Sequence, residues 1–121
     1  MKPYNRQNII PASTVMNTTI NSTPIQVYNC FVYAIQIVFT GTPTGGFKLQ
    51  SSNDPAFSSQ PGYPINWTDI ANSTFTVSAA GNVEWNVEQV GYNWVRVVYT
   101  DSSGGTSTAV VSSATFNGKG F

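Results

Sequence analysis

Residues 31–40 read FVYAIQIVFT, and the two-residue periodicity of this stretch decides the fold class. On one face of an extended strand it places Phe31, Tyr33, Ile35, Ile37 and Phe39. The other face carries Val32, Ala34, Val38 and one polar residue, Gln36. A strand that is apolar on both faces is central and covered on both sides. We therefore predict a central strand with a second sheet on one side and a neighbouring subunit on the other.

Working outward, further segments show the composition and alternation of β-strands, separated by turns rich in Gly, Pro and Asn. They are residues 24–30, 47–52, 65–70, 73–78, 82–87, 90–100 and 106–116. Residues 92–100 and 106–116 flank DSSGG and predict a closing hairpin. No stretch has the 3.6-residue apolar period of a capped helix. The pattern predicts an all-β protein, a two-sheet antiparallel β-sandwich of jelly-roll-like type with about eight strands.

The length of 121 residues suits one domain. Residues 1–23 differ from the rest because they hold the polar tract STVMNTTINST and only a short apolar run, NIIP. We expect an extended N-terminal arm over 1–23 and a β-sandwich domain over 24–121. The N-terminus lacks the apolar core of a signal peptide, and the longest apolar run is too short to span a bilayer.

Charge and residue usage exclude several function classes. Five basic and five acidic residues give a net charge of zero, so there is no basic stripe for nucleic acid. Without histidine, the commonest general base and transition-metal ligand are both missing. The acids Asp54, Asp69, Glu84 and Glu88 lie in turns or on polar faces, which is a poor basis for a catalytic pair. We expect no enzyme activity and no cofactor.

The segment LQSSNDPAFSSQPGYPINWTDI, residues 49–70, contains the candidate contact residues. Phe57 and Tyr63 lie in a loop rich in Pro, Gly and Ser, and together with Asn53 and Asp54 they could form a ligand surface. Asn53, Asp54 and Asp69 also carry Ca²⁺-type oxygen ligands, but such residues are ordinary turn formers, so no metal is expected.

Four side chains in the strand-like segments have predicted structural roles. We expect Trp67 and Trp94 in the core. Arg96 interrupts an apolar strand and needs a partner if buried, with Asp69 or Glu84 as the natural choice. Cys30, the only cysteine, is expected to be a small buried hydrophobe and can form no intrachain disulfide.

Two resemblances add to this interpretation. The stretches KLQSSND, NWTDI and YNWVRVVYT are similar to the discoidin or galactose-binding-like sandwich pattern. The matching positions are Ser52, Asn53, Asp54, Asn66, Trp67, Thr68, Val95 and Arg96. The inserted PAFSSQPGYPI departs from the tight turn of those modules.

The second resemblance covers almost the whole chain. The polar arm, IQIVFTGTPTGGFKLQSSNDP, VGYNWVRVVYT, SGGTSTAVV and the terminal GKG look like small virion structural proteins of bacteriophages. That resemblance implies a non-enzymatic capsid-decorating, head-fibre or tail-associated protein located in the virion. It also implies that the protein is oligomeric. From the apolar second face of the central strand and the N-terminal arm, we predict a homo-oligomer, preferentially a trimer, that contacts other virion proteins. The alternative is a carbohydrate-binding module that recognises a host-surface glycan; neither hypothesis involves nucleic acid or a membrane.

Overall fold

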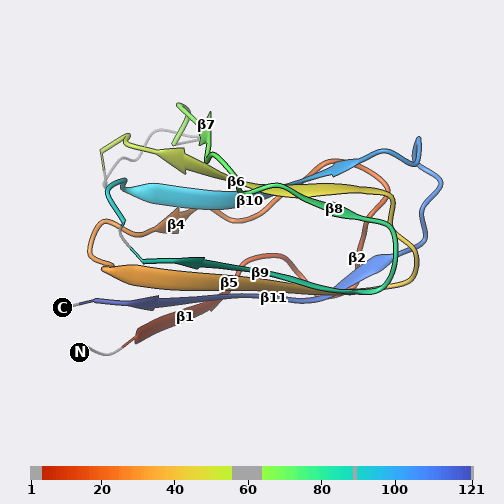
Figure 1. Ribbon diagram of the computed structural model, residues 1–121, viewed down its shortest axis with the longest axis horizontal. Helices are drawn as coiled ribbons and strands as arrows, with labels where there is room; N and C mark the ends of the chain where they lie inside the picture. Colours follow the sequence, from red (N-terminus) through yellow and green to blue (C-terminus); the bar gives the residue numbers. More distant parts are fainter. Residues whose placement is uncertain (1–3, 56–63, 89, 121) are drawn as a thin grey trace.

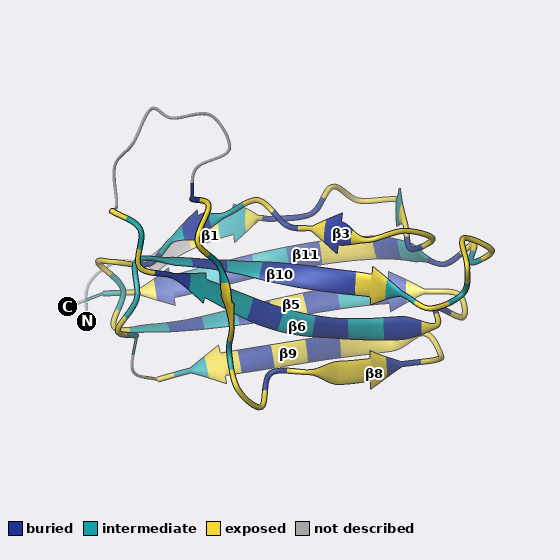
Figure 2. Ribbon diagram, turned by 90° about the horizontal axis from the view of Figure 1, so that it is seen from above, coloured by how far each residue is buried: buried dark blue, intermediate teal, exposed yellow. Residues whose placement is uncertain are grey.

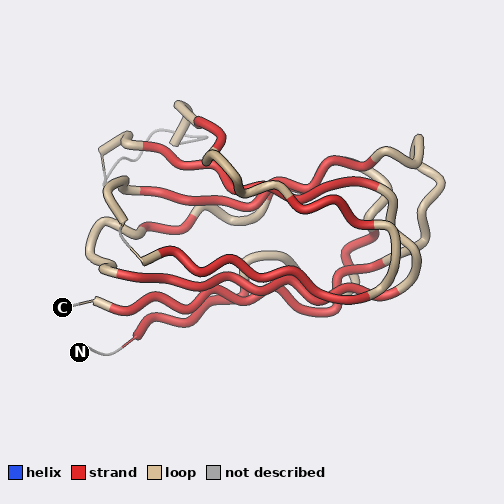
Figure 3. The backbone as a smooth tube through the Cα atoms, in the orientation of Figure 1, coloured by secondary structure: helices blue, strands red, loops and turns tan. Residues whose placement is uncertain are grey.

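Two stacked antiparallel sheets make up the computed structural model, which describes residues 4–55, 64–88 and 90–120. Figure 1 shows the sheets as an upper and a lower layer, with the two described chain ends side by side at one end of the lower layer. The described residues form strands and loops without any helix (Figure 3). The predicted all-β, two-sheet architecture is confirmed.

The lower layer, sheet A, has the strand order β1-β11-β5-β9. Its strands are β1 (Tyr4–Asn8), β2 (Thr14–Val15), β5 (Val32–Thr40), β9 (Gly81–Val87) and β11 (Val110–Lys119). β2 pairs with β11 beyond the end of β1. The register between β11 and β5 shifts between Val111 and Ser113, where a bulge interrupts the ladder.

The upper layer, sheet B, has the strand order β3-β10-β6-β7. Its strands are β3 (Ile20–Asn21), β4 (Ile25–Gln26), β6 (Gly45–Ser52), β7 (Thr68–Asp69), β8 (Phe75–Val77) and β10 (Trp94–Asp101). β3 and β4 share one edge of β10, and β7 and β8 share one edge of β6.

The described chain forms eleven strands rather than the expected eight. The difference arises at sheet edges, because three edge positions are each divided into two short strands: β1 with β2, β3 with β4, and β7 with β8. Each sheet is therefore four strand positions wide. Short, interrupted edges are a common way to prevent edge-to-edge aggregation.

The core lies between the sheets, and the alternation in β5 is realised as predicted from Tyr33 to Phe39. The odd-numbered side chains of β5 are buried, while Gln36 and Thr40 are exposed. Buried and exposed bands alternate along the long strands in Figure 2. Phe31 precedes β5 and is 42% exposed, so the periodicity does not extend to it.

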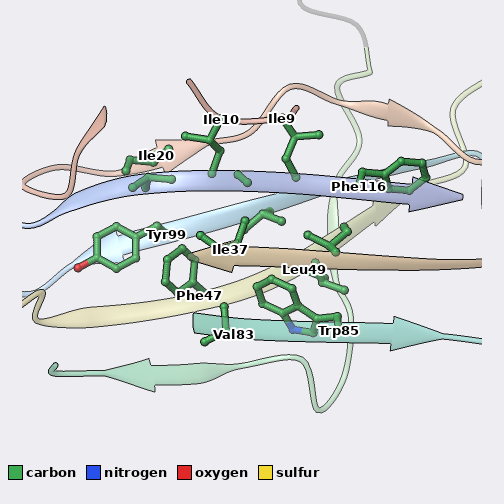
Figure 4. Close-up of a cluster of buried hydrophobic side chains, with 14 of the residues drawn as sticks. Ile9, Ile10, Ile20, Ile37, Phe47, Leu49, Val83, Trp85, Tyr99 and Phe116 are labelled. Carbon is green, nitrogen blue, oxygen red and sulfur yellow. The ribbon is translucent and has the colours of Figure 1, made fainter. Parts of the chain in front are cut away.

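Phe47 is at the centre of an aromatic cluster that joins the two sheets. Its ring lies 5.6 Å from that of Phe39, 6.3 Å from that of Trp85 and 4.8 Å from that of Tyr99, measured between centroids. All four rings are buried (Figure 4 labels three of them). Such ring pairs add to the free energy gained from burying their area.

Residues 4–23 do not form a separate arm. β1 pairs with β11, and Ile9 continues the contact by donating its amide to Ala114 at 3.0 Å. The same Ile9 accepts a bond from the amide of Thr23 at 3.0 Å, next to the β3–β10 pair. The segment thus closes one side of the sandwich. Its buried side chains are Ile9, Ile10, Met16, Ile20 and Ser22.

The predicted closing hairpin is wrong, because β10 belongs to sheet B and β11 to sheet A. The turn itself forms as the residues dictate: Asp101 accepts bonds from the amides of Ser103 and Gly105, both at 3.0 Å. After this turn the chain crosses from sheet B to sheet A, so β11 does not pair with β10. A Gly/Ser turn marks a reversal of direction but does not specify which sheet receives the next strand.

Gly45 offers a first test of packing. A Cβ atom there would collide with the carbonyl oxygen of Thr100 and would lie 2.7 Å from the Tyr99 hydroxyl oxygen. We expect Gly45→Ala to lower the free energy of unfolding by about 1–3 kcal/mol, the usual cost of overpacking. Chemical denaturation measures it. Gly91→Ala is the matched control, because nothing lies within 4 Å of its added Cβ. Equal stability of the two variants would contradict the close approach.

Candidate functional site

Asp54 holds together the two ends of the loop between β6 and β7. One carboxylate oxygen accepts bonds from the backbone amides of Ile65 and Asn66 at 2.8 and 3.1 Å. The other accepts a bond from the Asn66 side-chain amide at 2.8 Å. The Asn66 side-chain bond, helped by the backbone bonds, lowers the pKa of Asp54. Asn93 also donates to the Asp54 carbonyl at 2.9 Å, which ties this loop to the start of β10.

Asp54 is therefore a loop clamp, and Asn53 lies beside it on the exposed surface. The other two predicted contact residues, Phe57 and Tyr63, lie outside the described residues. The discoidin-like positions separate into two groups. Val95 is buried in the core. The others lie around the loop and on the outer face of sheet B: Ser52, Asn53, Asp54, Asn66, Trp67, Thr68 and Arg96.

The clamp predicts a pH dependence whose sign is fixed by the lowered pKa of Asp54. The carboxylate stabilises the closed loop fully above the ordinary carboxyl pKa of about 3.9, and that stabilisation is lost as pH falls through the lower folded pKa. We expect Asp54→Asn to remove the hydrogen-exchange protection of the Ile65 and Asn66 amides at neutral pH. Wild-type protein should lose it only in acid, as followed by NMR.

Asp101→Asn is the matched control for the clamp. It removes another half-buried carboxylate with a lowered pKa, which bonds to Ser103 and Gly105 instead. This variant should leave the Ile65 and Asn66 amides protected. Unchanged protection of those amides in Asp54→Asn would show that the loop closes without the carboxylate.

A polar and aromatic cluster covers the outer face of sheet B next to this loop. The Arg96 guanidinium carbon lies 4.4 Å from the centroid of the Trp67 ring, a cation–π contact. Arg96 also donates to Gln50 at 2.8 Å, and Gln50 donates to Asp69 at 2.8 Å. We call this cluster the sheet B patch; it consists of Lys48, Gln50, Trp67, Asp69, Trp94 and Arg96.

The predicted ion pair between Arg96 and Asp69 is replaced by a relay. Asp69 forms its ion pair with Lys48 at 3.0 Å, and Gln50 stands between Asp69 and Arg96. The Gln50 bond, followed by Lys48, lowers the pKa of Asp69, while partial burial lowers the pKa of Arg96. Register explains the result, because Gln50 pairs directly with both Arg96 and Asp69 across neighbouring strands.

Neither tryptophan of the patch is a core residue. Trp67 and Trp94 are half-buried, and their indole nitrogens donate to the carbonyls of Pro64 and Pro55 at 3.0 and 3.2 Å. Trp94 alternates with the buried Val95 and therefore points to the outer face of β10. The sequence did contain a signal for this orientation: Trp94 has the same two-residue period as the charged Arg96 and directly follows the polar Asn93.

The outer face of sheet A carries a second candidate surface. The sequence predicted that one face of residues 31–40 contacts a neighbouring subunit, but it did not show which residues of other strands share that face. In register across all four strand positions lie Arg6, Asn117, Ala34 and Asn86. Around this row is an open depression of about 510 Å³, also lined by Val32, Tyr33 and Lys119. Ala34 is the smallest side chain of the row, so the floor is lowest there. Figure 1 shows no described segment below this face.

The next row of the same face contains Asn8, Thr115, Gln36 and Glu84. A smaller hollow continues past Val32 and Asn86 to Phe31 and Glu88. The face thus combines amides, hydroxyls and short aliphatic side chains, with charges only at its margins. It can make many directional hydrogen bonds over a nearly flat area.

The described residues contain no cluster of three or more His, Cys, Asp or Glu side chains that could hold a metal ion. Asp54 and Asp69 are both engaged by protein donors. Cys30 is half-buried rather than fully buried, and desolvation raises its pKa. Over the same described residues, no helix has the length and apolarity needed to cross a membrane.

No protein-family model matches the chain, and no curated protein matches its sequence. Among solved structures, the SPBc2 prophage-derived protein YomS aligns with a TM-score of 0.59 at 12% identity, covering 96% of this chain and 92% of YomS. This likeness shows that the two proteins share a fold.

Two other solved structures align more loosely. A chitosan-binding module of a Paenibacillus sp. IK-5 chitosanase/glucanase has a TM-score of 0.49 at 17% identity, covering 98% of this chain and 95% of the module. The tobacco streak virus coat protein has a TM-score of 0.43 at 8% identity, covering 97% and 85%. At these scores neither alignment supports a conclusion about this chain.

Proposed function

We propose that this protein is a non-enzymatic structural component of a bacteriophage virion, in a capsid-decorating, head-fibre or tail-associated position. It works by assembling with copies of itself and docking on other virion proteins. The observation that carries the proposal is the outer face of sheet A, a surface four strand positions wide that the described chain leaves uncovered and whose charges lie at its margins.

Three further features support the proposal. The zero net charge gives weak colloidal repulsion, which suits a protein that stays assembled. Val32, Ala34 and Val38 are half-buried on the outer face of β5, and they offer apolar area that a partner protein could contact. The fold shared with a prophage-derived protein is consistent with a phage origin.

The test is whether particles contain the chain. An epitope-tagged copy expressed during particle production should travel with virions through a density gradient at a fixed stoichiometry. Ala34→Arg, in the middle of the sheet A face, should lower that stoichiometry, whereas Thr100→Arg on the exposed outer face of sheet B should not. Particles without the tagged wild-type chain would overturn the proposal.

A second candidate function is carbohydrate binding at the sheet B patch. The observation in its favour is that Trp67 and Trp94 are half-buried on one face together with Gln50 and Asp69. Aromatic faces next to polar groups can bind sugar rings. A glycan array separates the hypotheses: binding that Trp67→Ala abolishes and Ala34→Arg leaves intact would favour this second function.

A further inference from the structure

The charges on the outer face of sheet A are separated by sign. Arg6 on β1 and Lys119 at the end of β11 lie toward one edge, whereas Glu84 on β9 and Glu88 directly after it lie at the other. Figure 2 shows β1 and β9 as the two margins of this sheet, with β11 and β5 between them. Within the described residues, the ion pair is between Lys48 and Asp69, so none of these four charges is neutralised by a salt bridge there.

The shape of the face shows a matching asymmetry. Asn117 on β11 and Ala34 on β5 are direct neighbours in one row, so a larger side chain stands beside the lowest point of the depression. A complementary partner surface would present a depression opposite Asn117 and a larger side chain opposite Ala34. The same face of a second copy, rotated by 180° about an axis parallel to the strands, meets that description.

We propose that two copies of this chain pack sheet A against sheet A around a two-fold axis that runs parallel to the strands. The inference rests on the proposed function and specifies its self-assembling surface. Such an axis exchanges the two edges of the sheet and keeps each residue at the same level along the strands. Aligned packing of sheet faces about 10 Å apart is a standard arrangement.

The two-fold operation brings the opposite charges together. Arg6 then faces Asn86 of the second copy, whose neighbours on that edge are Glu84 and Glu88. Lys119 faces Val32 of the second copy, next to the same Glu88. The interface is isologous, so each of these contacts occurs twice. The same operation places Asn117 over Ala34 of the second copy, and Ala34 under its Asn117.

The size of the face sets the expected affinity. Four strands about 4.8 Å apart and seven residues rising about 3.3 Å each give a surface of roughly 450 Å² per copy. The total of roughly 900 Å² for the two copies lies below the roughly 1,200–2,000 Å² of standard specific interfaces and belongs to the weak or transient class. We expect a dissociation constant of about micromolar or weaker, and further weakening as ionic strength rises.

The experiment is charge reversal, followed by sedimentation equilibrium of the full chain at low and high salt. The variant Arg6→Glu/Lys119→Glu leaves four acids on the face, and Glu84→Lys/Glu88→Lys leaves four bases. We expect each to raise the dissociation constant at least about tenfold, because attractive pairs become repulsive. An equal mixture of the two variants should form a heterodimer, and the variant with all four reversals should recover wild-type affinity within about threefold.

Lys48→Glu on sheet B changes the net charge by two units, half the change in each double variant, away from the proposed interface, and it should leave the dimer unchanged. All four reversed side chains are exposed, and a thermal melt checks that the fold is retained. A wild-type monomer at millimolar concentration, a trimer, or reversal variants that dimerise like wild type would each overturn the inference. If the tagged chain is found in virions but does not dimerise, the dimer is wrong and the proposed virion function stands. If the chain dimerises but is not incorporated into virions, the proposed virion function is wrong.

Discussion

Deleting residues 1–23 is expected to abolish cooperative folding of the domain. The deletion removes four buried apolar side chains, Ile9, Ile10, Met16 and Ile20. At about 1.5–3 kcal/mol for each buried side chain, the loss is about 6–12 kcal/mol. That equals most or all of the 5–15 kcal/mol that typically stabilises a domain. Near-ultraviolet circular dichroism and a thermal melt should show no native packing and no sharp transition.

The loss extends to backbone bonds. The amide of Val97 donates to the Ser22 hydroxyl at 2.8 Å, and Ser22 donates its own amide to the Val97 carbonyl at 2.9 Å. Without the segment, both groups of Val97 lose partners at the edge of β10, and buried groups without partners are costly. Adding a synthetic 1–23 peptide to the truncated chain should restore the native spectrum.

Two adjacent substitutions check the same interpretation without truncation. Met16 is fully buried whereas Val15 is 40% exposed. Met16→Ala should lower the free energy of unfolding by about 2–5 kcal/mol, the usual range for a buried side chain. Val15→Ala should cost under about 1 kcal/mol, as at most surface positions. A truncated chain that melts cooperatively with a wild-type spectrum would restore the detached-arm hypothesis.

The contrast between β5 and the N-terminal segment shows what sequence could reveal here. In β5 a two-residue period runs from Val32 to Thr40 because both sides of the strand are paired and one face is buried throughout. Residues 9–22 cross from sheet A to sheet B, so their buried side chains occur at irregular intervals. Periodicity reports burial only while a strand keeps one orientation. The segment therefore resembled a polar arm.

The candidate surfaces were predictable only in part. An Arg inside an apolar strand indicated a need for compensation, and Arg96 does have partners. The identity of those partners depends on the register of β6 against β10 and β7, which no local pattern specifies. The same holds for sheet A, where Arg6, Asn117, Ala34 and Asn86 come from four distant parts of the chain. Only non-local pairing places them in one row.

Trp85→Ala is the substitution with the next largest expected effect. The Trp85 side chain extends from sheet A into the core, where 6% of it remains exposed. Its indole nitrogen donates to the Ser73 carbonyl at 2.7 Å, and Ser73 in turn accepts the Leu49 amide of sheet B at 3.0 Å. Removing the ring therefore leaves a cavity and also breaks a polar link between the layers.

We expect Trp85→Ala to lower the free energy of unfolding by about 3–5 kcal/mol, as measured by denaturant titration with an unchanged m-value. Trp85→Phe separates the two contributions, since it keeps a ring near Phe47 but lacks the donor to Ser73. Its cost should be about 1–3 kcal/mol, the penalty for a buried carbonyl that loses its partner. Phe31→Ala is the matched control, because that aromatic side chain is 42% exposed and should cost under about 1 kcal/mol. A loss below about 1 kcal/mol in Trp85→Ala would mean that the inner face of β9 is assigned incorrectly, and with it the packing of sheet A on sheet B.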